Sequence, residues 1–175
     1  MTLPNQIFDL NPVDYVVPGA VGAPGKRTFY LQARKAYRLV TVICEKEHVS
    51  TLSLAADRLL MALAGGDAVA AVEPDPATMS MALEVPFEPL FRVGQINLGY
   101  DETSKRIVII ALELLEEGDE STPSALRLWL TPAQMRAFGI RGQELVAAGR
   151  PLCAMCGQPV DPEGHFCPRR NGHRT

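Results

Sequence analysis

The sequence predicts an α+β protein with a mostly antiparallel sheet, two helices packed on one face of the sheet, and a small C-terminal tail. Three observations support this fold class. Two pairs of β-type segments are separated by short turns, two helical patterns each follow a strand, and three of the four cysteines lie after residue 150. A sheet with one apolar face becomes stable when amphipathic helices cover that face.

The first half of the chain is predicted to be a hairpin followed by a helix. Arg27–Arg34 and Tyr37–Glu45 are rich in β-branched and aromatic residues, and only a very short turn separates them. His48–Leu63 carries apolar residues at helical spacing and ends at glycines 65–66. Residues 67–88 are rich in Ala, Pro and acidic residues, which predicts a flexible connection.

The second half repeats this order. Leu90–Tyr100 and Lys105–Glu113 form a predicted hairpin, and Ala125–Leu130 is a predicted strand. Thr131 and Pro132 have the residue types of a helix N-cap and first helical position, so a helix is expected from there to about residue 148. Two glycines, at positions 139 and 142, weaken this helix.

The two halves, at about 27–65 and 90–149, resemble one another. With an offset of 86 residues the apolar positions of the two helices coincide, and in both halves a β segment leads directly into the helix. A duplicated strand–helix unit explains the match, although any amphipathic helix after a strand would match about as well.

Composition predicts a soluble body at residues 1–149 and a separate tail at 150–175. The net charge is −3, and the tail is positive whereas the body is acidic. An acidic body argues against nucleic-acid binding, which relies on many Lys and Arg contacts to phosphate. We find neither a signal peptide nor a membrane-spanning segment, and we expect a cytoplasmic protein.

The tail contains the pattern of a zinc site. Cys153 and Cys156 are separated by two residues, Gly157 permits a tight turn beneath them, and Cys167 follows after ten more. The order is similar to a zinc ribbon, except that Arg170 replaces the second cysteine of the second turn. We therefore expect a structural Zn²⁺ and a zinc-ribbon-like tail.

Two residues compete for the fourth position on the metal. The preferred set is Cys153, Cys156, Cys167 and His173, and the alternative set replaces His173 with His165. A third arrangement has three protein ligands and a water, which would leave an open, catalytic position. A segment this short cannot bury enough apolar surface to fold alone, so a closed structural site is favoured.

Other candidate site residues are weaker. Four basic side chains near the first hairpin could hold an anion: Lys26, Arg27, Arg34 and Lys35. The glycine-rich segment before them departs from the phosphate-loop pattern. Cys44 lies in an apolar strand and is expected to be a buried hydrophobe, and His48 is expected to be a surface or half-buried residue.

The chain resembles a bacterial family catalogued as a domain of unknown function (DUF 3090). The resemblance rests on residues 22–32, on Cys44–Glu47 at the start of the first helix, and on the tail motif of residues 161–173. It covers nearly the whole chain, and it implies no assigned activity and no catalytic residues.

Three functions follow from these observations. The leading hypothesis is a non-catalytic, zinc-stabilised binding or adaptor protein with a protein partner, because the sequence shows one metal cluster without an acid, base or nucleophile set. The second is an enzyme that acts on a phosphorylated or acidic small molecule through a basic cleft. The third is weak nucleic-acid binding through four arginines of the tail: Arg150, Arg169, Arg170 and Arg174.

Overall fold

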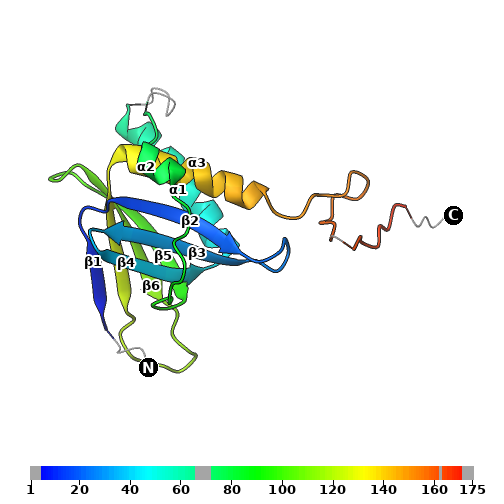
Figure 1. The fold of residues 1–175 in the computed structure, drawn as a ribbon, viewed down its shortest axis with the longest axis horizontal. Coiled ribbons are helices and arrows are strands. Elements are labelled where there is room, and N and C mark those ends of the chain that lie inside the picture. Colours follow the sequence, from blue (N-terminus) through cyan, green and yellow to red (C-terminus); the bar gives the residue numbers. More distant parts are fainter. Residues whose placement is uncertain (1–4, 66–71, 162, 171–175) are drawn as a thin grey trace.

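The computed structural model describes residues 5–65, 72–161 and 163–170. These residues contain seven strands and three helices in an α+β arrangement, which confirms the predicted fold class. The helices lie together on one side of the strands, and the tail extends from the end of the last helix (Figure 1).

The strands form two sheets instead of the single predicted one. The first has the order β2-β3-β4 and the second the order β1-β7-β6-β5, and all neighbours are antiparallel except β1 and β7. The bounds are β1 Ile7–Leu10, β2 Tyr15–Val21, β3 Thr28–Lys35, β4 Arg38–Cys44, β5 Val93–Asp101, β6 Arg106–Glu113 and β7 Ala125–Leu130.

The two sheets meet where β4 approaches the start of β5. Ile43 and Arg92 form an isolated parallel bridge, and the Ile43 N–H donates to the carbonyl of Phe91 at 3.0 Å. The Leu90 N–H donates to the carbonyl of Thr41 at 2.8 Å. Apolar side chains from both sheets and from the helices belong to one buried cluster, so the sheets share a single core.

Strand β7 shows how alternation sets the orientation of a sheet. Leu126, Leu128 and Leu130 are fully buried, whereas the residues between them are partly exposed. On the other face the Trp129 indole N–H donates to Asp9 Oδ1 at 2.7 Å, and Arg127 pairs with the same carboxylate. The alternation of apolar and polar side chains along β7 therefore places one face of the strand on the core, as the sequence predicts.

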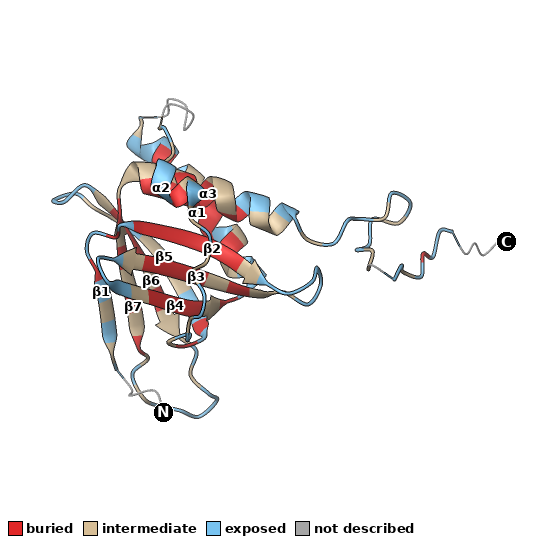
Figure 2. Ribbon diagram, viewed as in Figure 1, coloured by how far each residue is buried: buried red, intermediate tan, exposed pale blue. Residues whose placement is uncertain are grey.

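Two long helices cover the core: α1 Lys46–Leu63 and α3 Pro132–Ala147. α3 begins as predicted, because the Thr131 hydroxyl accepts from the Gln134 N–H at 3.1 Å and the Gln134 side chain accepts from the Thr131 N–H at 2.9 Å. The two helices pack against one another, and their buried faces lie toward the strands (Figure 2).

The two glycines of α3 lie at its contact with α1 and do not break the helix. An added Cβ on Gly142 would overlap Ser53 Oγ and lie 3.3 Å from Val49 Cγ1, whereas one on Gly139 would meet Ala56 Cβ at an ordinary 3.6 Å. Glycine at position 142 thus allows the two helices to approach closely, and this gain offsets its low helix propensity.

Three elements differ from the sequence prediction. β1 was not expected, and it forms through parallel pairing with β7, far along the chain. β2 lies in a segment that has Pro18 and Gly19, which are unfavourable in strands, but it is an edge strand and α3 covers it. The predicted flexible connection contains a short helix, α2 (Pro76–Ser80), whose first turn is capped by Asp75 through a 2.8 Å bond from the Thr78 N–H. Tertiary contacts decide the two strands, whereas α2 combines its local cap with packing against α3.

The halves of the chain share an order of elements. Each has three consecutive antiparallel strands followed by a long helix: β2-β3-β4-α1 and β5-β6-β7-α3. The N-cap residues Glu45 and Thr131 stand 86 residues apart, which is the offset found in the sequence. Duplication stays a prediction, and this common order supports it.

Candidate metal centre

The tail begins beyond α3, and its first turn is built around Cys153. The Cys153 N–H donates to the carbonyl of Gln158, and the Gly157 N–H donates to the carbonyl of Cys153, both at 2.8 Å. Gly157 has φ +72°, a conformation that glycine adopts without strain. This tight turn holds the side chains of Cys153 and Cys156 near one another.

A second pair of turns positions the other two side chains. The Gly164 N–H donates to the carbonyl of Asp161 at 2.8 Å, and the Arg170 N–H donates to the carbonyl of Cys167 at 3.1 Å. His165 directly follows the first of these turns, and Cys167 is the first residue of the second. Arg170 stands where a zinc ribbon has its last cysteine, and here its backbone closes the turn.

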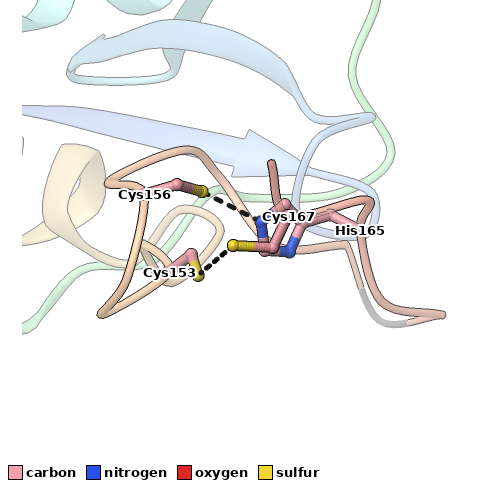
Figure 3. Close-up of side chains that lie close together, drawn as sticks. All are labelled: Cys153, Cys156, His165 and Cys167. Carbon is pink, nitrogen blue, oxygen red and sulfur yellow. Dashed lines mark hydrogen bonds between the residues drawn. The ribbon is translucent and has the colours of Figure 1, made fainter. Parts of the chain in front are cut away.

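The four side chains of this Cys₃His group converge on one point (Figure 3). Their donor atoms all lie within 4.8 Å of one another; Cys153 Sγ is 3.8 Å from Cys167 Sγ, and Cys156 Sγ is 3.2 Å from His165 Nε2. Thiolates bound at about 2.3 Å to a tetrahedral Zn²⁺ are about 3.8 Å apart. A disulfide would require about 2.05 Å between sulfurs. The group can therefore hold a metal ion.

Backbone groups of the first turn favour a thiolate at Cys153. The N–H groups of Cys156 and Met155 hydrogen-bond to its sulfur and lower the pKa of Cys153 to about 7. At Cys156 the Gln158 N–H lowers the pKa, but lost hydration and the neighbouring thiols of Cys167 and Cys153 outweigh it and raise the pKa above its usual value. Because metals bind the thiolate, Cys153 is better prepared than Cys156 to act as a ligand.

The described structure brings together three of the four preferred ligands. Cys153, Cys156 and Cys167 are joined by His165, the alternative fourth residue. The preferred fourth residue, His173, lies outside the described residues. The arrangement of the described residues thus supplies four donor atoms without it.

The other cysteine and histidine highlighted in the sequence lie elsewhere. Cys44 is buried at the end of β4, where burial and the adjacent charge of Glu45 raise its pKa to about 12. His48 accepts a hydrogen bond at Nδ1 from the Glu45 N–H at 3.1 Å, at the start of α1. Cys44 is therefore a core residue, and His48 helps to form the helix N-terminus.

The four predicted anion-binding side chains do not line one cleft. Lys26 and Arg27 precede β3, whereas Arg34 and Lys35 are its last two residues. The eight residues of β3 span roughly 25 Å at the usual rise per residue. Lys35 donates to the carbonyl of Asn11. The structure thus divides this set into two distant pairs.

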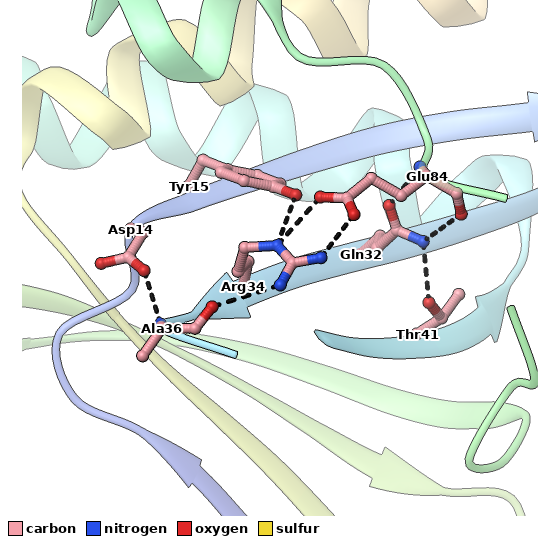
Figure 4. A network of polar contacts seen from close by, with 7 residues as sticks. All are labelled: Asp14, Tyr15, Gln32, Arg34, Ala36, Thr41 and Glu84. Atoms are coloured by element: carbon pink, nitrogen blue, oxygen red, sulfur yellow. Dashed lines mark hydrogen bonds and ion pairs between the residues drawn. The ribbon is translucent and has the colours of Figure 1, made fainter. Parts of the chain in front are cut away.

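Arg34 is engaged in a polar network with the segment before β5 (Figure 4). Its guanidinium pairs with the carboxylate of Glu84, and its Nε lies 3.1 Å from the Tyr15 hydroxyl. Beside it the buried Gln32 side chain donates to the Glu84 carbonyl at 3.1 Å and accepts from the Glu84 N–H at 2.8 Å. Gln32 also donates to the Thr41 hydroxyl. These groups attach residue 84 to the first sheet.

We expect Gln32→Leu to lower the free energy of unfolding by about 2 kcal/mol, because the N–H and carbonyl of Glu84 lose their partners in a partly buried place. Urea denaturation would measure the loss. Gln95→Leu is the control, since the Gln95 side chain is exposed on β5 and, in the described part of the chain, bonds only to Asn97. Its effect should stay within about 0.5 kcal/mol. Equal effects of the two substitutions would contradict a structural role for Gln32.

Two of the four tail arginine side chains bond to other groups of the tail. Arg150 Nη1 lies 2.8 Å from Asp161 Oδ1, and Arg169 Nη1 donates to the carbonyl of Met155 at 3.0 Å. Arg170 is exposed, and Arg174 lies outside the described residues. Two of the four charges proposed for nucleic-acid binding therefore already have protein partners.

The fold and the site define an α+β protein with a Cys₃His group in its C-terminal tail. The chain belongs to the family described as "Protein of unknown function (DUF3090)", whose profile matches residues 8–167 and confirms the resemblance seen in the sequence. The matched range includes all four members of the Cys₃His group. No curated protein and no solved structure matches the chain. Across the described part of the chain, no helix is long and apolar enough to cross a membrane.

Proposed function

We propose that this protein is a non-catalytic binding protein whose tail is folded by a structural Zn²⁺. Cys153, Cys156, His165 and Cys167 would hold the ion. The observation that carries the proposal is the convergence of their four donor atoms within 4.8 Å. Three thiolates and one imidazole form a ligand set that suits Zn²⁺, which prefers sulfur and nitrogen in tetrahedral geometry.

Two features favour a structural role over a catalytic one. Four protein donors fill a tetrahedral site, whereas catalytic zinc keeps one position for water or substrate. A catalytic zinc also needs a general base nearby, but the tail carboxylate of Glu163 lines a different cavity together with Lys26 and Asp161. No step of chemistry is therefore assigned to this site.

The tail needs the metal because it has little secondary structure and little buried apolar surface to stabilise it. Among its described residues, 150–161 and 163–170, we find isolated bridges but no helix or extended strand. Its large apolar side chains are exposed: Leu152 by 67%, Met155 by 48% and Phe166 by 75%. A structural zinc supplies about 10 kcal/mol or more, which offsets the cost of ordering such a segment. We therefore propose a body at residues 1–149 and a metal-folded tail at 150–175.

The same exposed side chains support a protein partner. Aromatic residues and Met are enriched at the centres of protein interfaces, and here they lie on a small element that projects from the body (Figure 2). The metal would fix the turns that carry Met155 and Phe166. In this proposal the tail presents the apolar contact and the α+β body acts as its rigid support.

We expect purified protein to contain one equivalent of zinc, and the Co²⁺-substituted protein to show the absorption of tetrahedral thiolate coordination. Metal analysis and visible spectroscopy would measure both. Addition of azide should leave the Co²⁺ spectrum unchanged, because four protein donors exclude an added ligand. A protein without metal would refute the site, and a spectrum that shifts with azide would refute its closed, structural character.

A further inference from the structure

A second candidate site lies where the tail leaves the body. A cavity of about 230 Å³ is lined by residues that precede β3, begin α1 and follow α3. Three of its side chains are cationic, namely Arg27, Lys46 and Arg150, and no acidic residue is among those that line it in the described structure. The remaining side chains on its wall are apolar: Phe29, Leu152 and Pro159.

Two of the cations converge at Gly149. A Cβ added to Gly149 would lie 3.2 Å from Arg27 Nη2 and 3.3 Å from Lys46 Nζ. Both charged groups therefore reach the same small region of surface, which glycine leaves open. Like charges this close repel one another, so an anion placed between them would be stabilised by both.

Two of the three cationic side chains have partners among the described residues, and the third does not. Arg27 Nη1 donates to the carbonyl of Leu145 at 3.0 Å, which stabilises the C-terminus of α3, a helix without a basic residue in its last turn. Arg150 pairs with Asp161. The side chain of Lys46 is exposed, and within the described residues it makes neither a hydrogen bond nor an ion pair. Its charge is available to a ligand.

We infer that this cavity binds a phosphorylated small molecule, with the phosphate between Arg27 Nη2 and Lys46 Nζ. Guanidinium and ammonium groups both donate charged hydrogen bonds to phosphate oxygens, and Arg27 has Nη2 for this purpose while Nη1 bonds to Leu145. Lys46 is the first residue of α1, so the helix holds the base of this side chain in place at the edge of the cavity. The apolar wall formed by Leu152 and Pro159 would contact the organic part of the ligand.

The outer wall of this cavity rests on the proposed metal site. Leu152 and Pro159 form the bridge that closes the turn of Cys153 and Cys156. Arg27 and Lys46, by contrast, belong to the body. We therefore expect removal of the metal to weaken ligand binding without abolishing the attraction of the two body cations for phosphate.

Calorimetric titration of the full zinc-loaded chain with pyrophosphate would test the inference. We expect the wild-type protein to bind one pyrophosphate per chain. The Lys46→Gln variant should bind pyrophosphate about tenfold more weakly, because one charged hydrogen bond is lost. Lys35→Gln is the matched control: it removes the same charge at the far end of β3 and should leave the affinity unchanged. Circular dichroism would verify that both variants are folded.

The inference fails if the wild-type protein does not bind pyrophosphate at millimolar concentration. It also fails if the two lysine variants lose affinity equally, or if citrate binds as tightly as pyrophosphate. A chain that proves to contain no zinc would refute the proposed function, but the comparison of Lys46→Gln with Lys35→Gln would still decide the phosphate site. In zinc-containing protein, an affinity unchanged by chelation would refute the role of the Cys153 turn as the cavity wall.

Discussion

Replacement of Cys156 by Ser is expected to remove the metal and to unfold the tail while the body stays folded. Cys156 supplies one of the four converging donor atoms, and the tail has little buried apolar surface of its own. Loss of a residue that only hydrogen-bonds to a metal ligand costs roughly 10–100-fold in metal affinity, and loss of a ligand itself should cost more. Metal analysis would show the loss, and limited trypsin digestion should become rapid at Arg169 and Arg170.

The fourth cysteine provides the control. Cys44→Ala should keep one equivalent of zinc and a protease-resistant tail, because Cys44 is buried in the core and lies outside the Cys₃His group. In thiol titration, chelation of the wild-type protein should release three reactive thiols, since burial and a pKa of about 12 keep Cys44 inert until the body unfolds. A Cys156→Ser variant that retained zinc and a resistant tail would contradict this assignment.

The parallel substitution His165→Ala separates the two ligand sets. If His165 completes the site, as the described geometry indicates, its loss should release zinc, and His173→Ala should not. The opposite result would restore the set preferred from the sequence. Metal analysis of the two variants decides between them.

Gly142→Ala is expected to destabilise the body by about 1–3 kcal/mol, even though alanine favours helices. The added methyl would overlap Ser53 Oγ and lie 3.3 Å from both Ser53 Cβ and Val49 Cγ1 in the contact between α1 and α3. Overpacking of this kind typically costs about 1–3 kcal/mol and outweighs the gain in helix propensity of about 1 kcal/mol. Urea denaturation would measure the change.

Two further variants identify the cause. Gly139→Ala should be neutral or stabilising by up to about 1 kcal/mol, because its methyl meets Ala56 Cβ at 3.6 Å. Ser53→Ala removes the clashing oxygen, which among the described residues bonds only to the carbonyl of Val49, one turn earlier in α1. The double variant Ser53→Ala/Gly142→Ala should therefore recover much of the stability. Equal effects of the two glycine substitutions would rule out the clash.

Much of the fold was predictable because local patterns agree with it. The hairpin of β3 and β4, the strand β7 and the start of α3 at Pro132 all match the sequence expectation. Each has a local signal: alternation, a short turn, or a capping box. β2 has no such signal, since Pro18 and Gly19 disfavour a strand, and only its place beside β3 under α3 makes it one.

The sequence predicted that the tail holds a metal-binding group, but spacing alone did not decide between the two histidines as the fourth ligand. Close spacing along the chain indicates a metal group, because residues two or three positions apart must lie close together. Spacing favoured His173, whereas the turn at Gly164 brings His165 to the three cysteines. Lys46 was missed altogether. Its only local signal is a basic residue at the start of a helix, which gives no indication of the cavity it lines.

By itself, the sequence determined the α+β class, the order of the main elements, the three cysteines of the metal group and the membership of the family. These properties depend on neighbours along the chain. The tertiary structure decided the division into two sheets and the separation of Arg27 from Arg34. It also decided the ion pair between Arg34 and Glu84 and the approach of Arg27 and Lys46 to one another at Gly149. Those depend on contacts between residues far apart in the chain, which packing of the shared core brings together.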